Sequence, residues 1–467
     1  MKKSGKIMAA GLGAVILGAS LGGCDPEGSS SKKSGGYYGE SYRVECETTT
    51  ERRNKNLFGV MYIVGEGHTI NGWDYRTGFQ LMHNLGVGMV RYGIEGNCFP
   101  TLTTRDEDAI KLTHDMAAEA KKQGIELIWS CYFDYRNNQP NWSDSGIYRK
   151  DDREGSAYMK WLGDCASVFR RAAEEFPEAT VWELGNEPNG NKNYTDGTPA
   201  TYEEWAQIYA DYMYYASEAI HSVNPDAVVM MGAFTEPEGL GRSGNISYTD
   251  AQLSEKWGRR GQEGRAVSWL NYIYDYIESG AAPSMYPDDY FQCGSWHPYT
   301  FDRFDADYFV QENQKFYDVI KTREGKDKRC YITEFGFSDG FAGADFAIEN
   351  DADGAKRQAL IADYTVEMYE TVRDRMPYIE SVCYFRAFND TRDKYWAGDS
   401  DDFGRTISMY GLFYDPNPDF KYRDYYPRET EEGKTPKIPT AGAPKPVAYA
   451  YQQLAGGAGP LDLFVEK

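Results

Sequence analysis

The sequence predicts a (β/α)8 barrel, and three features of its pattern carry that prediction. Short apolar runs bounded by turn residues alternate with longer amphipathic stretches along most of the chain. Such runs are typical of parallel strands that are buried on both faces. The alternation repeats through eight apolar runs, and a further amphipathic stretch at residues 445–454 closes it as a last helix.

We expect the eight strands at short apolar runs that end near turn residues. They are residues 57–64, 87–93, 126–131, 180–185, 227–232, 291–297, 330–334 and 381–386. Helical patterns fall between them and include residues 106–123, 156–175, 202–221, 267–278 and 354–375.

The runner-up architecture is a doubly wound open sheet. It is disfavoured because no glycine-rich phosphate loop follows the first apolar run, and Gly65-Glu66-Gly67 lacks the third glycine of that motif. A plain barrel needs about 250 residues, so this chain of 467 residues has length to spare. The excess follows the fifth and eighth strands, at residues 235–266 and 387–444. In a barrel, those loops lie on the C-terminal face, where active sites are found.

The N-terminus has the pattern of a bacterial lipoprotein signal. Three lysines in the first six residues precede a short apolar run at residues 7–21, and a Leu-Gly-Gly-Cys sequence resembling a lipobox ends at Cys24. The run is shorter than the roughly 20 residues that span a bilayer. We therefore expect a signal peptide at residues 1–23, a lipidated Cys24 with a flexible tether at residues 24–50, and one barrel domain at residues 51–467. The protein would then be extracytoplasmic and anchored by lipid to the bacterial cell membrane or cell surface.

Charge and residue spacing argue against several other classes of protein. The formal net charge of −22 disfavours a nucleic-acid partner. The seven cysteines beyond Cys24 form no CxxC pair and are expected to be small buried hydrophobes. The five histidines show no zinc spacing, and the calcium-like run at residues 349–354 has Leu360 where a glutamate is required. We expect neither a metal nor another cofactor.

Three strand ends carry the candidate chemistry. The fourth, sixth and seventh strands end in WELGNEPN at residues 182–189, SWHPY at residues 295–299 and YITEFG at residues 331–336. Barrel enzymes keep their catalytic groups at this lip of the strands. Together the motifs resemble clan A of the glycoside hydrolases, barrels that retain anomeric configuration and carry one glutamate after strand four and another after strand seven.

The resemblance implies roles for individual residues. Glu187 matches the general acid/base and Glu334 the nucleophile of double-displacement hydrolysis, which needs two carboxyl groups about 5–5.5 Å apart. Asn186 matches the residue that contacts the sugar 2-hydroxyl. Tyr299 is similar to the strand-six tyrosine that orients the nucleophile, and Arg91 lies where many clan members carry an arginine near it.

Other residues are expected to line the cleft. His297 shares its strand face with Tyr299, and Trp129 and Trp142, with Tyr132 and Tyr194, are candidate rings for stacking on a sugar. Many clan members have a tryptophan at the end of strand eight, which is absent here. Either Phe388 or Trp396 takes that place, or the subsite is built differently. Alternatively, Arg386 recognises an acidic sugar through a bidentate contact.

Two families within the clan fit different motifs. The Asn-Glu-Pro-Asn run, with residues 411–413 and 445–446, resembles the family of β-xylosidases and α-iduronidases, whereas Thr-Glu-Phe-Gly resembles the large cellulase and mannanase family. The function expected is retaining hydrolysis of poly- or oligosaccharides. The alternatives are a glycan-binding lipoprotein on the same barrel without catalysis, and a structural or adhesive surface protein.

Overall fold

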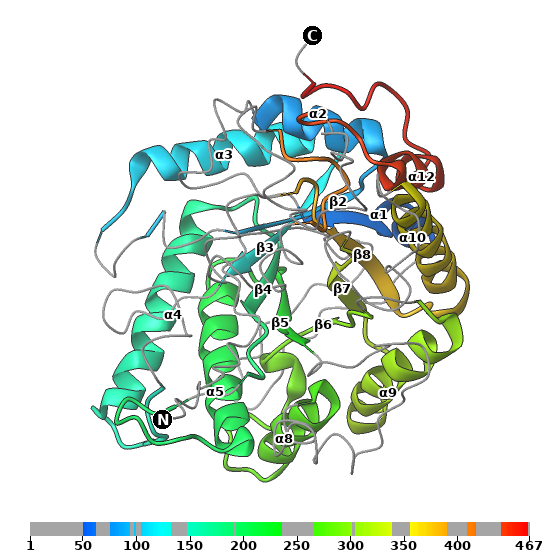
Figure 1. Cartoon of the computed structure of the whole chain (residues 1–467). Coiled ribbons are helices and arrows are strands. Elements are labelled where there is room, and N and C mark those ends of the chain that lie inside the picture. The colour runs from blue at the N-terminus through cyan, green and yellow to red at the C-terminus, as the bar shows by residue number, and fades with distance from the viewer. Residues whose placement is uncertain are drawn as a thin grey trace, which may run out of the picture.

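Eight parallel strands close into a barrel in sequence order, β1 to β8, and helices surround it (Figure 1). The structure, a computed structural model, describes residues 50–61, 75–93, 98–99, 104–131, 147–190, 193–235, 265–300, 304–338, 355–389, 409–416 and 440–465. The predicted (β/α)8 architecture is confirmed, and the open doubly wound sheet is wrong.

The strands are short, and nearly all of their residues are buried. They are β1 Phe58–Met61, β2 Met89–Gly93, β3 Glu126–Cys131, β4 Val181–Asn186, β5 Val228–Thr235, β6 Gly294–His297, β7 Cys330–Phe335 and β8 Ile379–Phe385. The helices are α1 Thr50–Asn56, α2 Tyr75–Leu85, α3 Glu107–Lys122, α4 Ala157–Glu175, α5 Tyr202–His221, α8 Ala266–Glu278, α9 Ala306–Glu324, α10 Ala355–Arg375 and α12 Pro446–Ala455, with a short 3-10 turn, η3, at Pro287–Asp289.

The barrel closes where β1 pairs in parallel with β8, and this seam aligns Gly59 with Cys383. The two strands approach so closely that a β-carbon at Gly59 would lie 2.7 Å from Ser381 Oγ and 2.8 Å from Cys383 Sγ. A glycine removes that clash. The seam therefore depends on a residue without a side chain.

The apolar residues form two layers because successive strand side chains point to opposite faces. A small cluster fills the inside of the barrel and consists of Met89, Ile128, Val181, Val228, Met230, Cys293, Tyr331 and Cys383. The alternate strand residues, such as Val90, Trp129 and Ile332, join the larger core between the strands and the helices. Arg91 and Glu334 follow the cluster residues Met89 and Tyr331 on their strands, so they lie beyond this apolar cluster toward the C-terminal end of the barrel.

Local signals in the sequence explain where several helices begin. Asp106 caps α3 by accepting from the backbone N–H groups of residues 108 and 109, and Ser156 caps α4. Thr201 and Glu204 form a reciprocal capping box at the start of α5. These caps satisfy N–H groups that have no partner within the helix.

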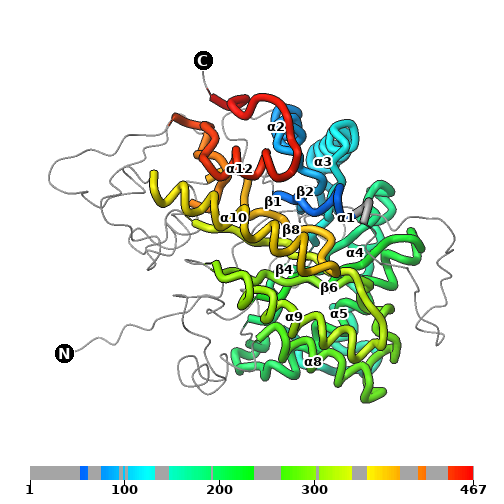
Figure 2. The backbone as a smooth tube through the Cα atoms, turned by 90° about the vertical axis from the view of Figure 1, so that its right-hand side faces the viewer, coloured from blue at the N-terminus to red at the C-terminus, as the bar shows by residue number. Residues whose placement is uncertain are grey.

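The helices form a ring in which neighbours in sequence pack side by side. Figure 2 shows α8, α9 and α10 stacked along one side of the barrel, and α12 beside α10 and α2. The last helix thus lies next to the first helices of the ring. It closes the outer layer over the β1–β8 seam, where Tyr451 donates a hydrogen bond to the carbonyl oxygen of Gly59 at 2.9 Å.

The predicted elements agree with the structure within a few residues. The third strand and the helix at residues 202–221 have the predicted bounds, whereas β5 runs on to Thr235 and β8 begins earlier, at Ile379. The predicted end of the first strand, at residues 62–64, lies outside the described residues. Helices α1, α2 and α9 are three helices that the sequence patterns named above did not include.

Six cysteines in the described part of the chain are free and buried, as predicted: Cys98, Cys131, Cys165, Cys293, Cys330 and Cys383. The signal peptide, Cys24 and the tether lie outside the described residues, so they stay predictions. Among the helices that the structure describes, none is both long enough and apolar enough to cross a membrane.

Candidate active site

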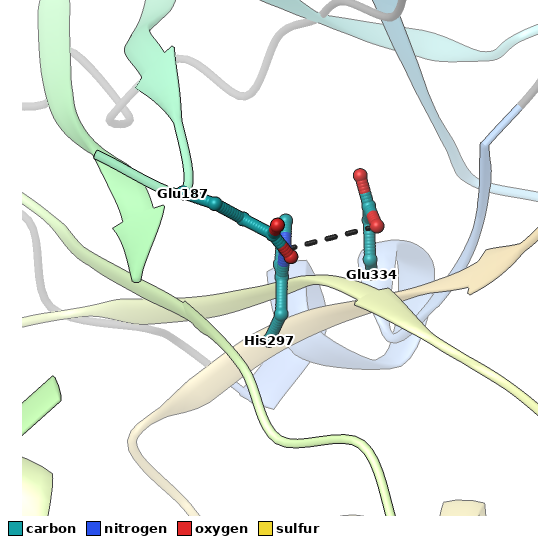
Figure 3. Close-up of side chains that lie close together, drawn as sticks. All are labelled: Glu187, His297 and Glu334. Carbon is teal, nitrogen blue, oxygen red and sulfur yellow. Dashed lines mark hydrogen bonds and ion pairs between the residues drawn. The ribbon is translucent and has the colours of Figure 1, made fainter. Parts of the chain in front are cut away.

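Polar side chains from four strands meet at the C-terminal end of the barrel. Arg91 lies on β2, Asn186 ends β4 with Glu187 directly after it, His297 ends β6, and Glu334 lies on β7. Figure 3 shows the side chains of Glu187, His297 and Glu334 pointing toward one another from these strand ends. The structure therefore brings together the two glutamates that the motifs singled out.

Glu187 reaches this position through an irregular end of β4. Gly185 has a φ of 102° and Glu187 a φ of 46°, a left-handed conformation that side chains other than glycine adopt rarely. The backbone is held there because the Glu187 N–H donates to the Ala233 carbonyl on β5 at 2.8 Å. Such conformations cluster at functional sites, where the surroundings enforce them.

A tyrosine on α5 supports the same irregular segment. The Tyr209 hydroxyl donates to the Leu184 carbonyl at 2.7 Å and accepts from the Gly232 N–H at 2.8 Å. Gly232 lies so close to β4 that a β-carbon there would sit 2.5 Å from the Leu184 oxygen. This hydroxyl therefore bridges β4 and β5 at Leu184 and Gly232, close to the strand end that carries Glu187.

Glu334 owes its direction to an extra residue in β7. Ile332 pairs with Val382 and Phe335 with Tyr384, so three steps along β7 match two along β8. A bulge of this kind changes the alternation of side chains and re-aims one of them. As a result, Thr333 and Glu334, although adjacent, both reach polar partners at the barrel end, while Ile332 and Phe335 face the outer core.

Two donors hold the carboxylate of Glu334. Arg91 Nη1 lies 2.5 Å from Oε1, and the Tyr299 hydroxyl donates to Oε2 at 2.9 Å. Burial raises the pKa of Glu334 above its ordinary value, and the charge of Arg91 and the two hydrogen bonds oppose this rise. Burial and the neighbouring Glu334 raise the pKa of Tyr299 well above its ordinary value, so the phenol stays protonated and donates. Arg91 and Tyr299 thus stabilise the ionised form of Glu334 against the effect of burial.

Arg91 is fully buried and links both halves of the site. Its Nε donates to Glu183 Oε2 at 2.6 Å, and its Nη2 donates to Asn186 Oδ1 at 2.8 Å, in addition to the contact with Glu334. Burial lowers the pKa of Arg91, but the charges of Glu183 and Glu334 more than offset it and raise the pKa above its ordinary value. The guanidinium thus remains charged between two carboxylates.

Glu187 has a different environment from Glu334. Its Oε1 lies 3.0 Å from His297 Nδ1, a ring nitrogen of a buried imidazole. Burial and the positive charge of Arg91 lower the pKa of His297 well below its ordinary value. The two glutamates therefore face opposite influences, a cation at Glu334 and a neutral imidazole at Glu187.

The two carboxyl groups are close together. One oxygen of Glu187, one oxygen of Glu334 and one ring nitrogen of His297 all lie within 4.8 Å of one another. This proximity suits retaining hydrolysis, with carboxyl groups about 5–5.5 Å apart, rather than inversion, which needs roughly 6.5–9.5 Å. These three residues could also ligate a cation, but Arg91 and Tyr299 already donate to both oxygens of Glu334.

Not every predicted residue joins the site. Trp129 was expected to stack on a sugar, and this prediction is wrong. Its indole is fully buried on the outer face of β3, where it packs against Phe176 and Trp182, at centroid distances of 5.3 and 6.3 Å. The alternation of β3 directs this ring toward the helices. Trp142, Trp396 and Tyr132 lie outside the described residues, so their roles stay predictions.

Three further candidates for sugar contacts are buried in the segments that follow β4 and β8. Phe388 packs against Phe413 and Phe464, at centroid distances of 5.2 and 5.3 Å. The guanidinium of Arg386 is buried 5.0 Å from the Phe385 ring centroid. Tyr194 stacks beneath the Arg149 guanidinium at 3.9 Å.

Sequence reasoning missed four residues that support the site. Glu183 and Thr333 form a buried hydrogen bond between β4 and β7, Ser295 contacts Thr333, and the Tyr410 ring packs on Tyr299. Glu183 carried a signal, since an acid in the middle of an apolar strand requires a partner. Nothing in the sequence marked the other three.

A closed barrel with this pair of glutamates at its C-terminal end defines a class of protein, the clan A retaining glycoside hydrolases. The sequence supports the same conclusion, because the model of Cellulase (glycosyl hydrolase family 5) matches residues 53–368. The chain belongs to glycosyl hydrolase family 5. Of the two families that the motifs suggested, the cellulase family is confirmed.

Comparison with solved structures supports the fold. The family 1 β-glucosidase from Thermotoga maritima has a TM-score of 0.50 and 14% identity, over 84% of this chain and 88% of its own. A GH5_18 protein from Streptomyces cattleya, solved in complex with Manβ1-4GlcNAc, has a TM-score of 0.50 and 13% identity, over 86% and 80%. No curated protein matches the sequence.

Proposed function

We propose that this enzyme hydrolyses glycosidic bonds of poly- or oligosaccharides by double displacement, with Glu187 as acid/base and Glu334 as nucleophile. The observation that carries the proposal is the contrast between two adjacent carboxyl groups. Glu334 is held by a cation and a phenol, whereas Glu187 contacts a buried imidazole. One carboxyl group is thus suited to be ionised and the other to carry a proton.

In the first step, a carboxylate oxygen of Glu334 attacks the anomeric carbon. An ester bond forms to the enzyme, the glycosidic C–O bond breaks, and the proton of Glu187 passes to the leaving oxygen. Arg91 and Tyr299 keep the nucleophile ionised and aligned before the attack. Such preorganised electrostatics is usually the largest contribution to catalysis.

In the second step, Glu187 acts as a base. Its carboxylate takes a proton from water, and the hydroxide oxygen attacks the anomeric carbon and breaks the ester bond to Glu334. Both glutamates return to their starting protonation states, and the anomeric configuration is retained after two inversions.

Asn186 is oriented to contact the sugar. Its side-chain oxygen accepts from Arg91 Nη2 at 2.8 Å, which fixes the orientation of the amide. The amide NH2 group is therefore the end that can donate to the 2-hydroxyl of the bound sugar. A contact there strengthens as the transition state forms.

The test uses purified protein without residues 1–23, together with the variants Glu334→Gln and Glu187→Gln. A panel of plant and bacterial glycans, including Manβ1-4GlcNAc and β-glucosides, is incubated with each protein, and the products are analysed by chromatography. Wild type should release products, and both variants should lose at least about 10³-fold in rate. The matched control is Glu370→Gln, a surface glutamate on α10 whose side chain is 50% exposed, which should retain full activity.

The anomeric configuration of the first product, followed by NMR during hydrolysis, tests the retaining outcome. Inverted product contradicts the assignment of Glu334 as nucleophile. Saturable binding of one glycan without cleavage by wild type favours the non-catalytic glycan-binding protein instead.

We also propose that the enzyme is a lipoprotein acylated at Cys24. The proposal is supported by the basic and apolar segments before the Leu-Gly-Gly-Cys sequence. When the full chain is produced in bacteria fed a labelled fatty acid, the label should enter wild type and Cys46→Ser but not Cys24→Ser. Equal labelling of both variants, or no labelling of wild type, contradicts the anchor.

A further inference from the structure

The hydroxyl of Thr333 contacts Glu183 of β4 directly and is linked through His297 to Glu187, which follows β4. Its Oγ1 lies 2.7 Å from Glu183 Oε1, 3.1 Å from Ser295 Oγ and 3.0 Å from His297 Nε2. His297 Nδ1, on the other side of the ring, lies 3.0 Å from Glu187 Oε1. A single hydroxyl therefore has three polar neighbours but only one proton to donate.

Counting donors decides where that proton goes. Glu183 is paired with the guanidinium of Arg91 at 2.6 Å, so it is an ionised carboxylate that can only accept. The Thr333 proton therefore points to Glu183. The two lone pairs of Thr333 Oγ1 then accept from Ser295 Oγ–H and from His297 Nε2–H.

This count fixes the tautomer of His297. Its Nε2 must carry a proton, and a neutral imidazole has only one N–H. The ring is neutral because burial and the charge of Arg91 disfavour its protonated form, as the lowered pKa of His297 indicates. Its Nδ1 therefore presents a bare lone pair to Glu187.

We propose that Thr333 is a positioning residue that, through the tautomer of His297, keeps Glu187 in its acid form. A bare nitrogen 3.0 Å from Glu187 Oε1 can accept a hydrogen bond from the protonated carboxyl group, but it repels the lone pairs of the ionised one. This inference rests on the proposed role of Glu187 as acid/base and adds to it the reason why the carboxyl group is protonated before the first step.

Charged and titratable groups face His297 from β2, from β4 and its end, from β7 and from the segment after β6. Arg91 comes from β2, Glu183 and Glu187 from β4 and its end, and Glu334 from β7, with Oε2 3.7 Å from His297 Nδ1. Tyr299 follows β6 and packs its ring at 6.3 Å from the imidazole. Arg91 opposes a positive imidazole, and Glu334 is already held by Arg91 and Tyr299, so Glu187 is the acid that shares a proton with Nδ1.

The same arrangement serves both steps of the reaction. When Glu187 gives its proton to the leaving oxygen, the new carboxylate faces the bare Nδ1, which makes it a stronger base. It then takes the proton of the attacking water, and the O–H···Nδ1 hydrogen bond is restored. The proton is not lost to Thr333 or Glu183, because the Nε2–H bond stays intact throughout.

The first test measures the tautomer directly and needs no activity. Protein labelled with ¹³C and ¹⁵N in histidine is studied by NMR near neutral pH, and the His297→Gln variant assigns the signal among the five histidines. Wild type should show the Nε2–H tautomer of His297. Thr333→Ser, which keeps the hydroxyl, should show the same tautomer, whereas Thr333→Val should lose it. An Nδ1–H tautomer in wild type overturns the proposal.

The second test is the pH dependence of kcat/KM on a substrate that the enzyme cleaves. In Thr333→Val, Nδ1 can carry the proton and donate to an ionised Glu187, so the alkaline limb should move down by about one pH unit. Thr333→Ser should keep the limb of wild type. Ser295→Ala removes one donor to Thr333 but leaves its bond to His297, and should also keep it.

The outcomes separate this inference from the proposed function. Circular dichroism shows whether Thr333→Val is folded. If the folded variant keeps the wild-type tautomer of His297 and the wild-type alkaline limb of kcat/KM, the inference about Thr333 is wrong. The role of Glu187 as the acid is not contradicted by that result. If no substrate is cleaved but the tautomer behaves as expected, the proposed reaction fails and the hydrogen-bond network stands. If Thr333→Val does not fold, the tautomer of His297 in wild type and in Thr333→Ser still decides the question, because an Nδ1–H tautomer overturns the proposal.

Discussion

Arg91 Nη1 lies 2.5 Å from Glu334 Oε1, and the same guanidinium contacts Glu183 at 2.6 Å. One buried cation thus lies between two buried carboxylates that come from β4 and β7. Its removal leaves both charges without compensation, which is far more costly than the loss of a surface ion pair. Stability and catalysis are therefore coupled at this residue.

We expect Arg91→Met to lower the free energy of unfolding by about 3–5 kcal/mol. In the variant, Glu334 loses the cation that opposes the effect of burial, so it is harder to ionise in the folded state than in the unfolded state. The destabilisation should therefore be largest near neutral pH and shrink as pH falls and Glu334 becomes protonated. Urea denaturation at several pH values measures it. If the loss of unfolding free energy is small or does not vary with pH, the buried ion pairs of Arg91 with Glu183 and Glu334 do not contribute as described.

Tyr299→Phe removes the donor to Glu334 Oε2 and keeps the ring. Because the hydrogen bond stabilises the ionised form, the pKa of Glu334 should rise further, and the acid limb of kcat/KM should shift to higher pH. Activity is lost as pH falls through this pKa, since only the ionised carboxylate attacks. The control is Tyr449→Phe, an exposed tyrosine of α12. An unchanged acid limb in Tyr299→Phe contradicts the assigned hydrogen bond.

Tyr209→Phe tests the support below Glu187. The change leaves the buried N–H of Gly232 without its acceptor and the Leu184 carbonyl without its donor, so we expect a loss of about 1–3 kcal/mol in the free energy of unfolding. Activity should fall as well, because the irregular end of β4 that presents Glu187 is released. Thermal unfolding and kcat measure the two effects. A stable variant with full activity shows that other contacts hold the segment.

Trp129→Phe distinguishes a core residue from a sugar platform. The indole is buried between β3 and the helices, so the change should lower the free energy of unfolding by about 1–3 kcal/mol and leave KM within twofold. A large rise in KM with little loss of stability points instead to a ring in the substrate cleft. Steady-state kinetics and urea denaturation on the same preparation separate the outcomes.

Much of the fold could be read from local patterns. Periodic apolar runs predicted all eight strands, and Asp106, Ser156 and the Thr201 capping box marked helix starts that the structure contains. The strand predictions erred at the ends of elements, as at β5 and β8, because there the tertiary contacts, not the local pattern, decide how far a strand continues.

The sequence by itself determined the barrel, the family and the positions of Glu187 and Glu334, because strand spacing and short motifs are local properties. Only the tertiary structure decided which side chains meet there. The bulge in β7 turns Glu334 toward Arg91, and the pairing of Glu183 with Thr333 sets the proton on His297. These contacts join residues that are far apart in the chain. Their hydrogen bonds form only when the barrel closes and brings donors and acceptors to within about 3 Å of each other.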